Sequence, residues 1–478
     1  MKQKLLILAG LIALSIALRV FSFFPSVINH DESTYLVIGD ALLSGNTYWV
    51  DYFDTKPFGI FGITAGVQWV FGKSIFFFRL FSACCLALTA FGLFLLQRFW
   101  GNSLRVGIAS GVMYLIMNSI FTFYGVSPNT ETFFNLFTIY AAILVFWPNK
   151  KSVMLYGLAG ILLGIGFLVK YVVAFDALAL GLFLLLDCWR GRLVFWDFFR
   201  KGFLMVAGFF IPFVLLYSFY ANIGETDSFL FHSFTVSSRY PNSPRVFHLL
   251  KFLADFLLRF LPITVFFVAA LLHKNIPTRL KQFGMLWGIC SLTAVMAPGI
   301  AFGHYFIQFM LPFSFVAGWT FGIKKIELPS YLKWLFRPQI GYSILGVLLS
   351  VNLFFQKMDF FDKTDDPRIV ADYLAEQLKP GDQIYTGNYS HILYYLLDRK
   401  SPTRYVHPSL FWSAQHIAAM DIDIDQEIQL IKAAAPRFVL MRKEFPDERF
   451  EELLRQGEYQ VVKIFPFKGL KVLEKRFQ

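Results

Sequence analysis

Cysteine is scarce in this sequence. There are four in 478 residues, and none lies after residue 290. The polar C-terminal region therefore holds no disulfide framework, and the spacing of the four fits no zinc-site pattern. That region also lacks a glycine-rich phosphate loop, so we assign no catalysis to it.

A basic tract interleaved with base-stacking aromatics is missing as well, although the formal net charge is +12. Residues 1–355 hold 26 Lys and Arg against 13 Asp and Glu, whereas residues 356–478 hold 18 against 19. The excess positive charge thus lies in the apolar part of the chain, where it marks the orientation of loops. Nucleic acid is not an expected partner.

Charged residues make up only 16% of the chain and hydrophobic ones 56%. Apolar runs of roughly 20 residues are long enough to cross a hydrocarbon core of about 30 Å. The first run follows Met1–Lys4 and lacks a small-residue cleavage site, so we interpret it as a retained signal anchor. The composition predicts a polytopic α-helical membrane protein.

Eleven apolar runs are candidate transmembrane helices. They lie near 5–24, 76–97, 104–124, 132–147, 152–169, 171–187, 203–220, 250–272, 283–298, 301–322 and 339–355. A cytoplasmic N-terminus places the basic clusters inside, and the odd count then carries the C-terminal region to the outer face. The expected location is the plasma (inner) membrane, with multiple passes. We predict a membrane domain over 1–355, with an outer-face loop at 25–75, and a soluble extracytoplasmic α/β domain over 356–478.

The C-terminal region alternates short strands with helices. Strands are predicted at 383–386, 437–441 and 459–465, and helices at 366–378, 391–398, 425–435 and 447–456. Such alternation favours a small α/β domain with a partly parallel sheet.

Acidic residues directly after the first apolar run are the strongest candidates for chemistry. Ionisable groups at a membrane boundary need a partner, a water-filled cavity or a metal ion. Asp31 and Glu32 are adjacent, so their side chains point in different directions. We expect Asp31 to be the catalytic or metal-binding carboxylate and Glu32 to support it. A solvated loop is the alternative.

Cations that could contact phosphate lie in the same predicted outer segments. Lys56 follows Asp54 by two residues, and that carboxylate could hold a divalent cation or keep the lysine charged. Lys170 lies at a predicted outer turn, with no acid beside it before Asp176. For both lysines the alternative is a side chain that extends to the membrane interface.

Other polar residues at predicted outer turns are weaker candidates. His304 and Tyr305 could donate hydrogen bonds to a phosphate or sugar, or only anchor the interface. Glu131 at a helix start suits the helix dipole.

These motifs resemble the membrane-embedded class C glycosyltransferases, in particular the group of the protein O-mannosyltransferases and the lipid A aminoarabinose transferase. The most specific elements are Asp31-Glu32 with Tyr35, followed by Asp51, Asp54 and Lys56-Pro57. The stretches 128–131, 164–170 and 304–312 are supporting matches. The resemblance covers about residues 5–355.

The resemblance implies a polyprenyl-phosphate-linked sugar as donor, entering from the outer leaflet, and an inverting displacement at the anomeric carbon. It implies that Asp31 activates the acceptor or helps to hold a divalent ion, with Asp54 as second carboxylate. Lys56 and Lys170 are implied as contacts to the leaving phosphate. Two departures from the family pattern matter: Thr34 stands where some relatives have arginine, and Thr55 separates Asp54 from Lys56. The second makes Asp51 a competing carboxylate.

Two other function classes remain open. A transporter or flippase of a lipid-linked sugar would use the same outer charges as a gate, but should show inverted repeats and broken helices near mid-membrane. A scaffold protein would act through the C-terminal domain. The acceptor in the leading hypothesis is a lipid, glycan or protein.

Overall fold

The computed structural model describes residues 1–120, 125–147, 152–239, 246–300, 302–323, 338–442, 448–467 and 469–476. The chain forms two compact units, each made of segments distant in sequence. Unit 1 comprises Met1–Phe24, Phe78–Leu216 and Asn242–Asp362, and unit 2 comprises Pro25–Phe77, Tyr217–Pro241 and Lys363–Gln478. The predicted outer loop thus groups with the C-terminal region. The predicted boundary at 355/356 does not follow these units, and its assignment to membrane and soluble parts stays a prediction.

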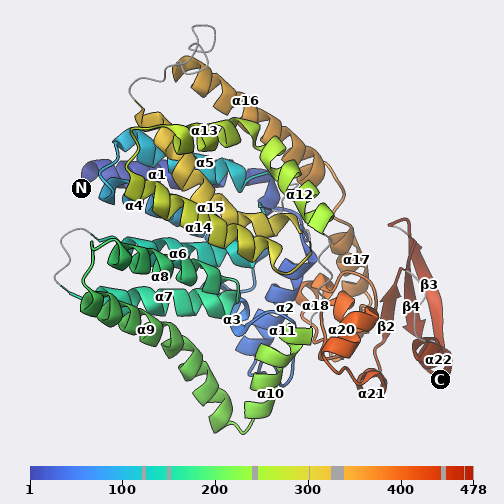
Figure 1. Cartoon of the computed structure of the whole chain (residues 1–478). Helices are drawn as coiled ribbons and strands as arrows, with labels where there is room; N and C mark the ends of the chain where they lie inside the picture. The colour runs from blue at the N-terminus through green and yellow to red at the C-terminus, as the bar shows by residue number, and fades with distance from the viewer. Residues whose placement is uncertain are drawn as a thin grey trace. The chain divides into compact units, whose positions relative to one another are not determined.

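Unit 1 is helical. Its principal helices are α1 (Lys2–Ala17), α4 (Ile75–Phe99, within the unit from Phe78), α5 (Leu104–Met117), α6 (Thr130–Val145), α7 (Met154–Val169), α8 (Val173–Trp189), α9 (Phe195–Asn222, within the unit to Leu216), α12 (Val246–Arg259), α13 (Leu261–Leu272), α14 (Thr278–Met296), α15 (Phe306–Ala317) and α16 (Pro338–Gln356). Short helical turns are η1 (Val20–Phe23), η4 (Gly303–Tyr305), η5 (Gly318–Gly322) and η7 (Lys357–Phe361). α6 packs on α7, and α14 packs on both α8 and α15 (Figure 1). Every predicted apolar run overlaps at least one of these helices.

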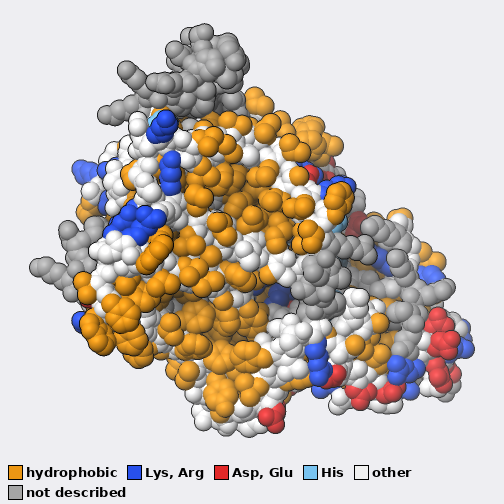
Figure 2. All heavy atoms as spheres, viewed as in Figure 1, with side chains coloured by type: hydrophobic (Ala, Val, Ile, Leu, Met, Phe, Trp, Pro, Cys, Tyr) orange, Lys and Arg blue, Asp and Glu red, His pale blue; other side chains and the backbone are white. Residues whose placement is uncertain are grey.

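Small residues allow α7 and α9 to approach closely. A Cβ atom added to Gly160 or Gly164 would collide with the backbone carbonyls of Met205 or Phe209, and one added to Gly208 would collide with that of Gly157. Such contacts between small residues are typical of helices that pack in a membrane. α9 also exposes a long apolar face that includes Phe195, Trp196, Phe199 and Phe203, and Figure 2 shows hydrophobic side chains over it.

Length and composition identify two helices that could cross a membrane, α4 and α9, among the described residues. α12 and α13 together would make a third, but they are bent by 95°. The sequence predicts an apolar run at 250–272, and the structure divides it into two helices, because Pro262 follows Leu261 at the start of α13, where its missing N–H interrupts the helix. The number of eleven crossings stays a prediction.

Unit 2 combines helices with a four-stranded sheet. From the segment 25–77 come α2 (His30–Leu43) and α3 (Phe58–Phe71), so this predicted loop is largely helical. α10 (Thr226–Leu230), η3 (Phe231–Thr235) and α11 (Val236–Arg239) come from the middle segment. The C-terminal segment adds α17 (Asp366–Ala375), α18 (Ile392–Leu396), α19 (Pro408–Trp412), α20 (Ala414–Ala419), α21 (Ile424–Ala434) and α22 (Glu448–Gln456).

The sheet contains β1 (Ile384–Tyr385), β2 (Phe438–Met441), β3 (Tyr459–Phe465) and β4 (Leu470–Lys475), in the order β1-β2-β4-β3. β1 pairs with β2 in parallel, and the other two pairs are antiparallel. The partly parallel sheet is confirmed, while β4 was missed. β4 fills the centre of the sheet between β2 and β3 (Figure 1).

Candidate active site

α2 begins where the sequence supplies a helix cap. The side chain of Asn29 accepts the Asp31 N–H at 3.1 Å, and both Asp31 and Glu32 lie in the first turn. Carboxylates at that end complement the helix dipole. Their exposure differs, since the Asp31 side chain is 22% exposed and Glu32 only 1%. The Asp31 side chain is thus partly accessible, and the Glu32 side chain is buried.

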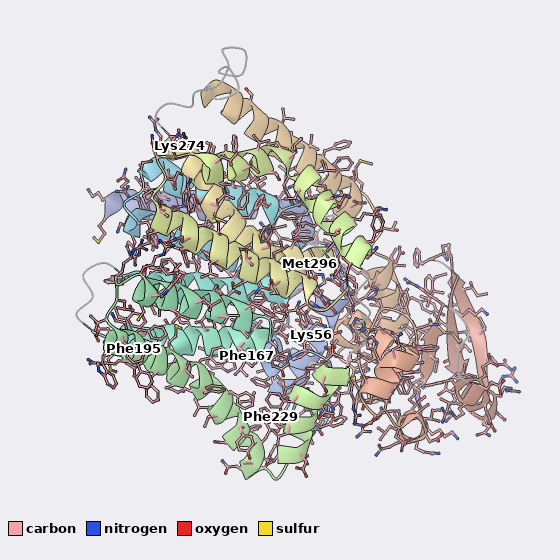
Figure 3. All side chains as sticks on the ribbon, in the orientation of Figure 1. Lys56, Phe167, Phe195, Phe229, Lys274 and Met296 are labelled. Atoms are coloured by element: carbon pink, nitrogen blue, oxygen red, sulfur yellow. The ribbon has the colours of Figure 1, made fainter. Side chains whose placement is uncertain are left out.

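Three predicted residues come together beside α2. The Lys56 ammonium lies 3.0 Å from Asp31 Oδ1 and 3.4 Å from Asp54 Oδ1. Asp54 is buried, whereas Lys56 is partly accessible. Figure 3 labels Lys56 in the segment between α2 and α3. The arrangement is one cation shared by two carboxylates.

Thr55 does not separate Asp54 from Lys56 in space, because the chain turns there. Asp54 Oδ1 accepts the Lys56 backbone N–H at 3.1 Å, which is the side-chain-to-backbone bond of an Asx turn. The Tyr48 hydroxyl donates to the Lys56 carbonyl at 2.5 Å and holds the turn. Asp51 instead accepts the Thr47 N–H at 2.6 Å. The geometry therefore favours Asp54 over Asp51 as the second carboxylate.

Lys56 carries its positive charge in this environment. Burial would lower the pKa of its ammonium, but the nearby Asp31 and Asp54 carboxylates outweigh burial, and the pKa lies well above its usual value. A fixed cation of this kind stabilises negative charge that develops on a leaving group.

The C-terminal segment, to which the sequence assigned no catalysis, supplies two histidines to this region. His407 Nε2 lies 3.7 Å from Asp31 Oδ1. His391 Nε2 lies 2.8 Å from the Thr34 hydroxyl on α2, and the ring centroids of His391 and His407 are 5.4 Å apart. Burial lowers the pKa of both rings, that of His391 well below its usual value, so both are neutral. No local motif marks these histidines, because they reach α2 only through the tertiary fold.

A divalent metal was an expectation for Asp31 and Asp54. Within the described ranges no group of three or more His, Cys, Asp or Glu side chains is placed to hold a metal ion. The Lys56 ammonium lies within 3.4 Å of both carboxylates. A cation already shared by the two acids does not fit with a second, divalent one between them. These residues therefore do not fit a metal site in this arrangement.

The remaining predicted residues form a separate cluster in unit 1. The Lys170 ammonium pairs with the Glu131 carboxylate and lies 3.9 Å from the ring centroid of Tyr305. His304 packs edge-on against Tyr305, with centroids 4.8 Å apart. Lys170 thus has an acidic partner that the sequence reading missed, because Glu131 lies 39 positions away. The structure brings Lys170, His304 and Tyr305 together, and Asp31, Asp54 and Lys56 together.

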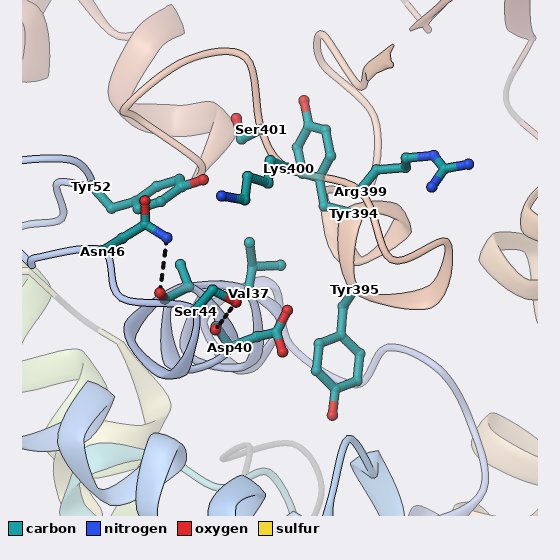
Figure 4. Close-up of a pocket in the computed structure, with 11 residues that line it drawn as sticks. Val37, Asp40, Ser44, Asn46, Tyr52, Tyr394, Tyr395, Arg399, Lys400 and Ser401 are labelled. Carbon is teal, nitrogen blue, oxygen red and sulfur yellow. Dashed lines mark hydrogen bonds between the residues drawn. The ribbon is translucent and has the colours of Figure 1, made fainter. Parts of the chain in front are cut away.

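A small polar pocket lies at the other end of α2. Asp40 and Ser44 line it together with Tyr52, Tyr394 and Lys400 (Figure 4). Its volume of about 20 Å³ has room for about one water molecule. We assign no chemistry to it.

The fold resembles the solved structures of ArnT and of an archaeal oligosaccharyltransferase. ArnT from Cupriavidus metallidurans bound to undecaprenyl phosphate matches with a TM-score of 0.70 and 14% identity, over 97% of each chain. The apo state of that protein matches with a TM-score of 0.64 and 15% identity, over 96% of this chain and 95% of the other. An archaeal oligosaccharyltransferase, AglB from Archaeoglobus fulgidus in complex with an inhibitory peptide and a dolichol-phosphate, matches with 0.53 and 10% identity, over 99% of this chain and 74% of that one.

Sequence comparison agrees with the fold. The family profile for dolichyl-phosphate-mannose-protein mannosyltransferase matches residues 55–217, a segment that includes Lys56, Glu131 and Lys170. The profile match, the curated relative and the solved structures together confirm that this chain resembles the group of class C polyprenyl-phosphate glycosyltransferases. Within it, the undecaprenyl phosphate-alpha-4-amino-4-deoxy-L-arabinose arabinosyl transferase of Photorhabdus laumondii is 26% identical over 166 residues. That match spans 33% of this chain and only 29% of the relative's length.

Proposed function

We propose that this protein is an inverting glycosyltransferase that moves a sugar from a polyprenyl-phosphate donor to a lipid, glycan or protein acceptor at the outer face of the membrane. The observation that carries the proposal is the Lys56 ammonium shared by Asp31 and Asp54. The fold of ArnT and the family match support it.

In the proposed reaction the acceptor's nucleophilic oxygen or nitrogen attacks the anomeric carbon of the sugar. Asp31 takes the proton that this atom loses. The bond between the anomeric carbon and the phosphate oxygen breaks, and the polyprenyl phosphate leaves with the bonding electron pair. Lys56 stabilises the charge that develops on that phosphate, and Asp54 holds Lys56 in place through its ammonium and its backbone N–H. Attack opposite the leaving phosphate inverts the anomeric configuration.

Lys170 is proposed as a second contact to the phosphate, with His304 and Tyr305 as further donors. Its side chain is 20% exposed, so it can reach a ligand while it stays paired with Glu131. The excess of basic residues in the predicted inner loops supports the outer-face orientation.

The test uses the full-length protein in proteoliposomes with polyprenyl-phosphate hexose or pentose, radiolabelled in the sugar, and a lipid extract as acceptor. We expect a new labelled glycolipid together with release of free polyprenyl phosphate, and loss of both with Asp31→Asn. Movement of the labelled donor across the bilayer without a covalent product would instead support the transporter or flippase alternative. Deletion of residues 356–478 that leaves a folded, fully active protein would exclude the scaffold alternative.

A further inference from the structure

His407 comes from the C-terminal segment and faces the carboxylate to which we assign proton transfer. Its Nε2 lies 3.7 Å from Asp31 Oδ1, the same oxygen that Lys56 contacts at 3.0 Å. We propose that His407 is a positioning residue for Asp31. The Nε2–H of His407 holds the Asp31 carboxylate in the orientation from which it accepts the acceptor's proton. The inference rests on the proposed function and extends it to the C-terminal segment.

The protonation of the ring follows from a local helix cap. His407 is the N-cap of α19, and its Nδ1 accepts the Ser409 backbone N–H at 3.2 Å. Pro408 has no N–H, so the Ser409 amide is the first donor that the new helix offers. A backbone amide can only donate, so this bond uses the Nδ1 lone pair, and the Ser409 hydroxyl, 2.7 Å from Nδ1, can donate to the same nitrogen. In the neutral ring the proton is therefore on Nε2.

This tautomer decides what His407 can do. An Nε2–H donates to a carboxylate oxygen but cannot itself accept a proton from the acceptor, so His407 is not the base. Burial lowers the pKa of the ring, which agrees with the neutral form. The distance of 3.7 Å is longer than a direct hydrogen bond, and such contacts commonly shorten when substrate binds. The imidazole is 17% exposed, so it is partly accessible, as the Asp31 side chain is.

The packing around His407 fixes its direction. His391 lies beside it with ring centroids 5.4 Å apart, and His391 in turn contacts Thr34 on α2. Because Asp31 and Thr34 are three residues apart on one helix, they lie on the same face. The C-terminal segment thus contacts that face of α2 at two neighbouring positions. Helix capping explains the bond at Nδ1, but it does not require Nε2 to face Asp31.

Two substitutions separate capping from positioning. His407→Asn keeps a short acceptor that caps α19 well but has no donor that reaches Asp31. His407→Gln places an amide N–H near the position of Nε2 and weakens the cap. His416 lies in the same segment, and its Nδ1 faces the Ser409 carbonyl; His416→Gln is the matched control.

We expect His407→Asn to lower kcat by about 10- to 100-fold, the scale of a misplaced reacting group, with KM for the lipid donor within twofold of wild type. His407→Gln should recover most of the kcat, and His416→Gln should behave as wild type. Wild-type kcat in His407→Asn would overturn the inference, and so would a His407→Gln variant as slow as His407→Asn. Either outcome leaves the proposed function standing, because the wild-type protein still transfers sugar.

A second measurement does not need activity. In protein labelled with ¹⁵N-histidine and reconstituted in membranes, the imidazole nitrogens report the tautomer, and the His407→Gln variant assigns the His407 signals. We expect a protonated Nε2 and an unprotonated Nδ1 at pH 7, and a shift of the Nε2 signal in Asp31→Asn. A ring protonated on Nδ1, or a signal insensitive to Asp31→Asn, would overturn the inference even if no transferase activity were found.

Discussion

Thr34 and His391 are 357 residues apart in sequence, yet the Thr34 hydroxyl lies 2.8 Å from His391 Nε2. Both side chains are fully buried. Thr34 follows Asp31 by one helical turn on α2, so this contact joins the C-terminal segment to the helix that carries the candidate base.

The first prediction concerns acid stability. Burial keeps the pKa of His391 well below its usual value, whereas in the unfolded chain it titrates near about 6.5. Below that pH the unfolded state binds one more proton at His391 than the folded state does, so the contribution of His391 to stability falls as pH drops, by up to about 1.4 kcal/mol per pH unit. Thermal unfolding at pH 7.5 and 5.5 measures this. The His391→Gln variant should be less stable than wild type at pH 7.5, but its stability should decrease less when the pH is lowered to 5.5. An equal loss in both proteins would contradict the assignment.

The second prediction concerns the base. Asp31→Asn removes the proton acceptor with little change in shape, and we expect kcat for sugar transfer to fall by about 10²–10⁴-fold. Asp51→Asn is the control, because Asp51 accepts a hydrogen bond from Thr47 in a local turn and should retain activity. Full turnover by Asp31→Asn would reject its catalytic role.

The third prediction concerns the shared cation. Lys56→Met removes the charge that would stabilise the leaving phosphate and should lower kcat by about 10²–10³-fold. It also leaves Asp31 and Asp54 without their common partner, so folding must be checked by thermal unfolding. The double variant Lys56→Met/Asp54→Asn relieves that charge imbalance. If the double variant regains wild-type turnover, Lys56 has no role at the phosphate.

The fourth prediction separates structure from binding at Lys170. Glu131 is 1% exposed and pairs with Lys170, so Lys170→Met leaves a buried carboxylate unpaired and should destabilise the protein by about 3–5 kcal/mol. Lys170→Met/Glu131→Gln should recover most of this loss. If Lys170 contacts the donor phosphate, the stable double variant still shows a raised KM for the lipid donor. An unchanged KM would limit Lys170 to a structural role.

The fifth prediction concerns metal. Since Lys56 occupies the space between Asp31 and Asp54, we expect initial rates of sugar transfer to be unchanged by EDTA and by added Mg²⁺ or Mn²⁺. Loss of activity in EDTA that a divalent cation restores would show that the two carboxylates rearrange to bind metal.

Local sequence rules account for the residues of the candidate site that are close together in the chain. Asn29 and the acids after it match a helix start, and helix α2 begins there. Thr55 places Asp54 two residues before Lys56, which departs from the family pattern, but a two-residue step is what an Asx turn needs. The sequence reading missed the bend between α12 and α13, because the hydropathy of a long apolar run is an average that one proline, Pro262, hardly changes.

The sequence by itself determined what neighbouring residues decide: the apolar runs, the capped start of α2, and a motif with two acids and a lysine. These depend on helix periodicity, on capping and on turn chemistry, which act over a few residues. Only the tertiary structure decided which distant groups meet, namely His407 with Asp31, His391 with Thr34 and Glu131 with Lys170. No short-range pattern marks these contacts, because each partner is brought in by the packing of elements far apart in the chain.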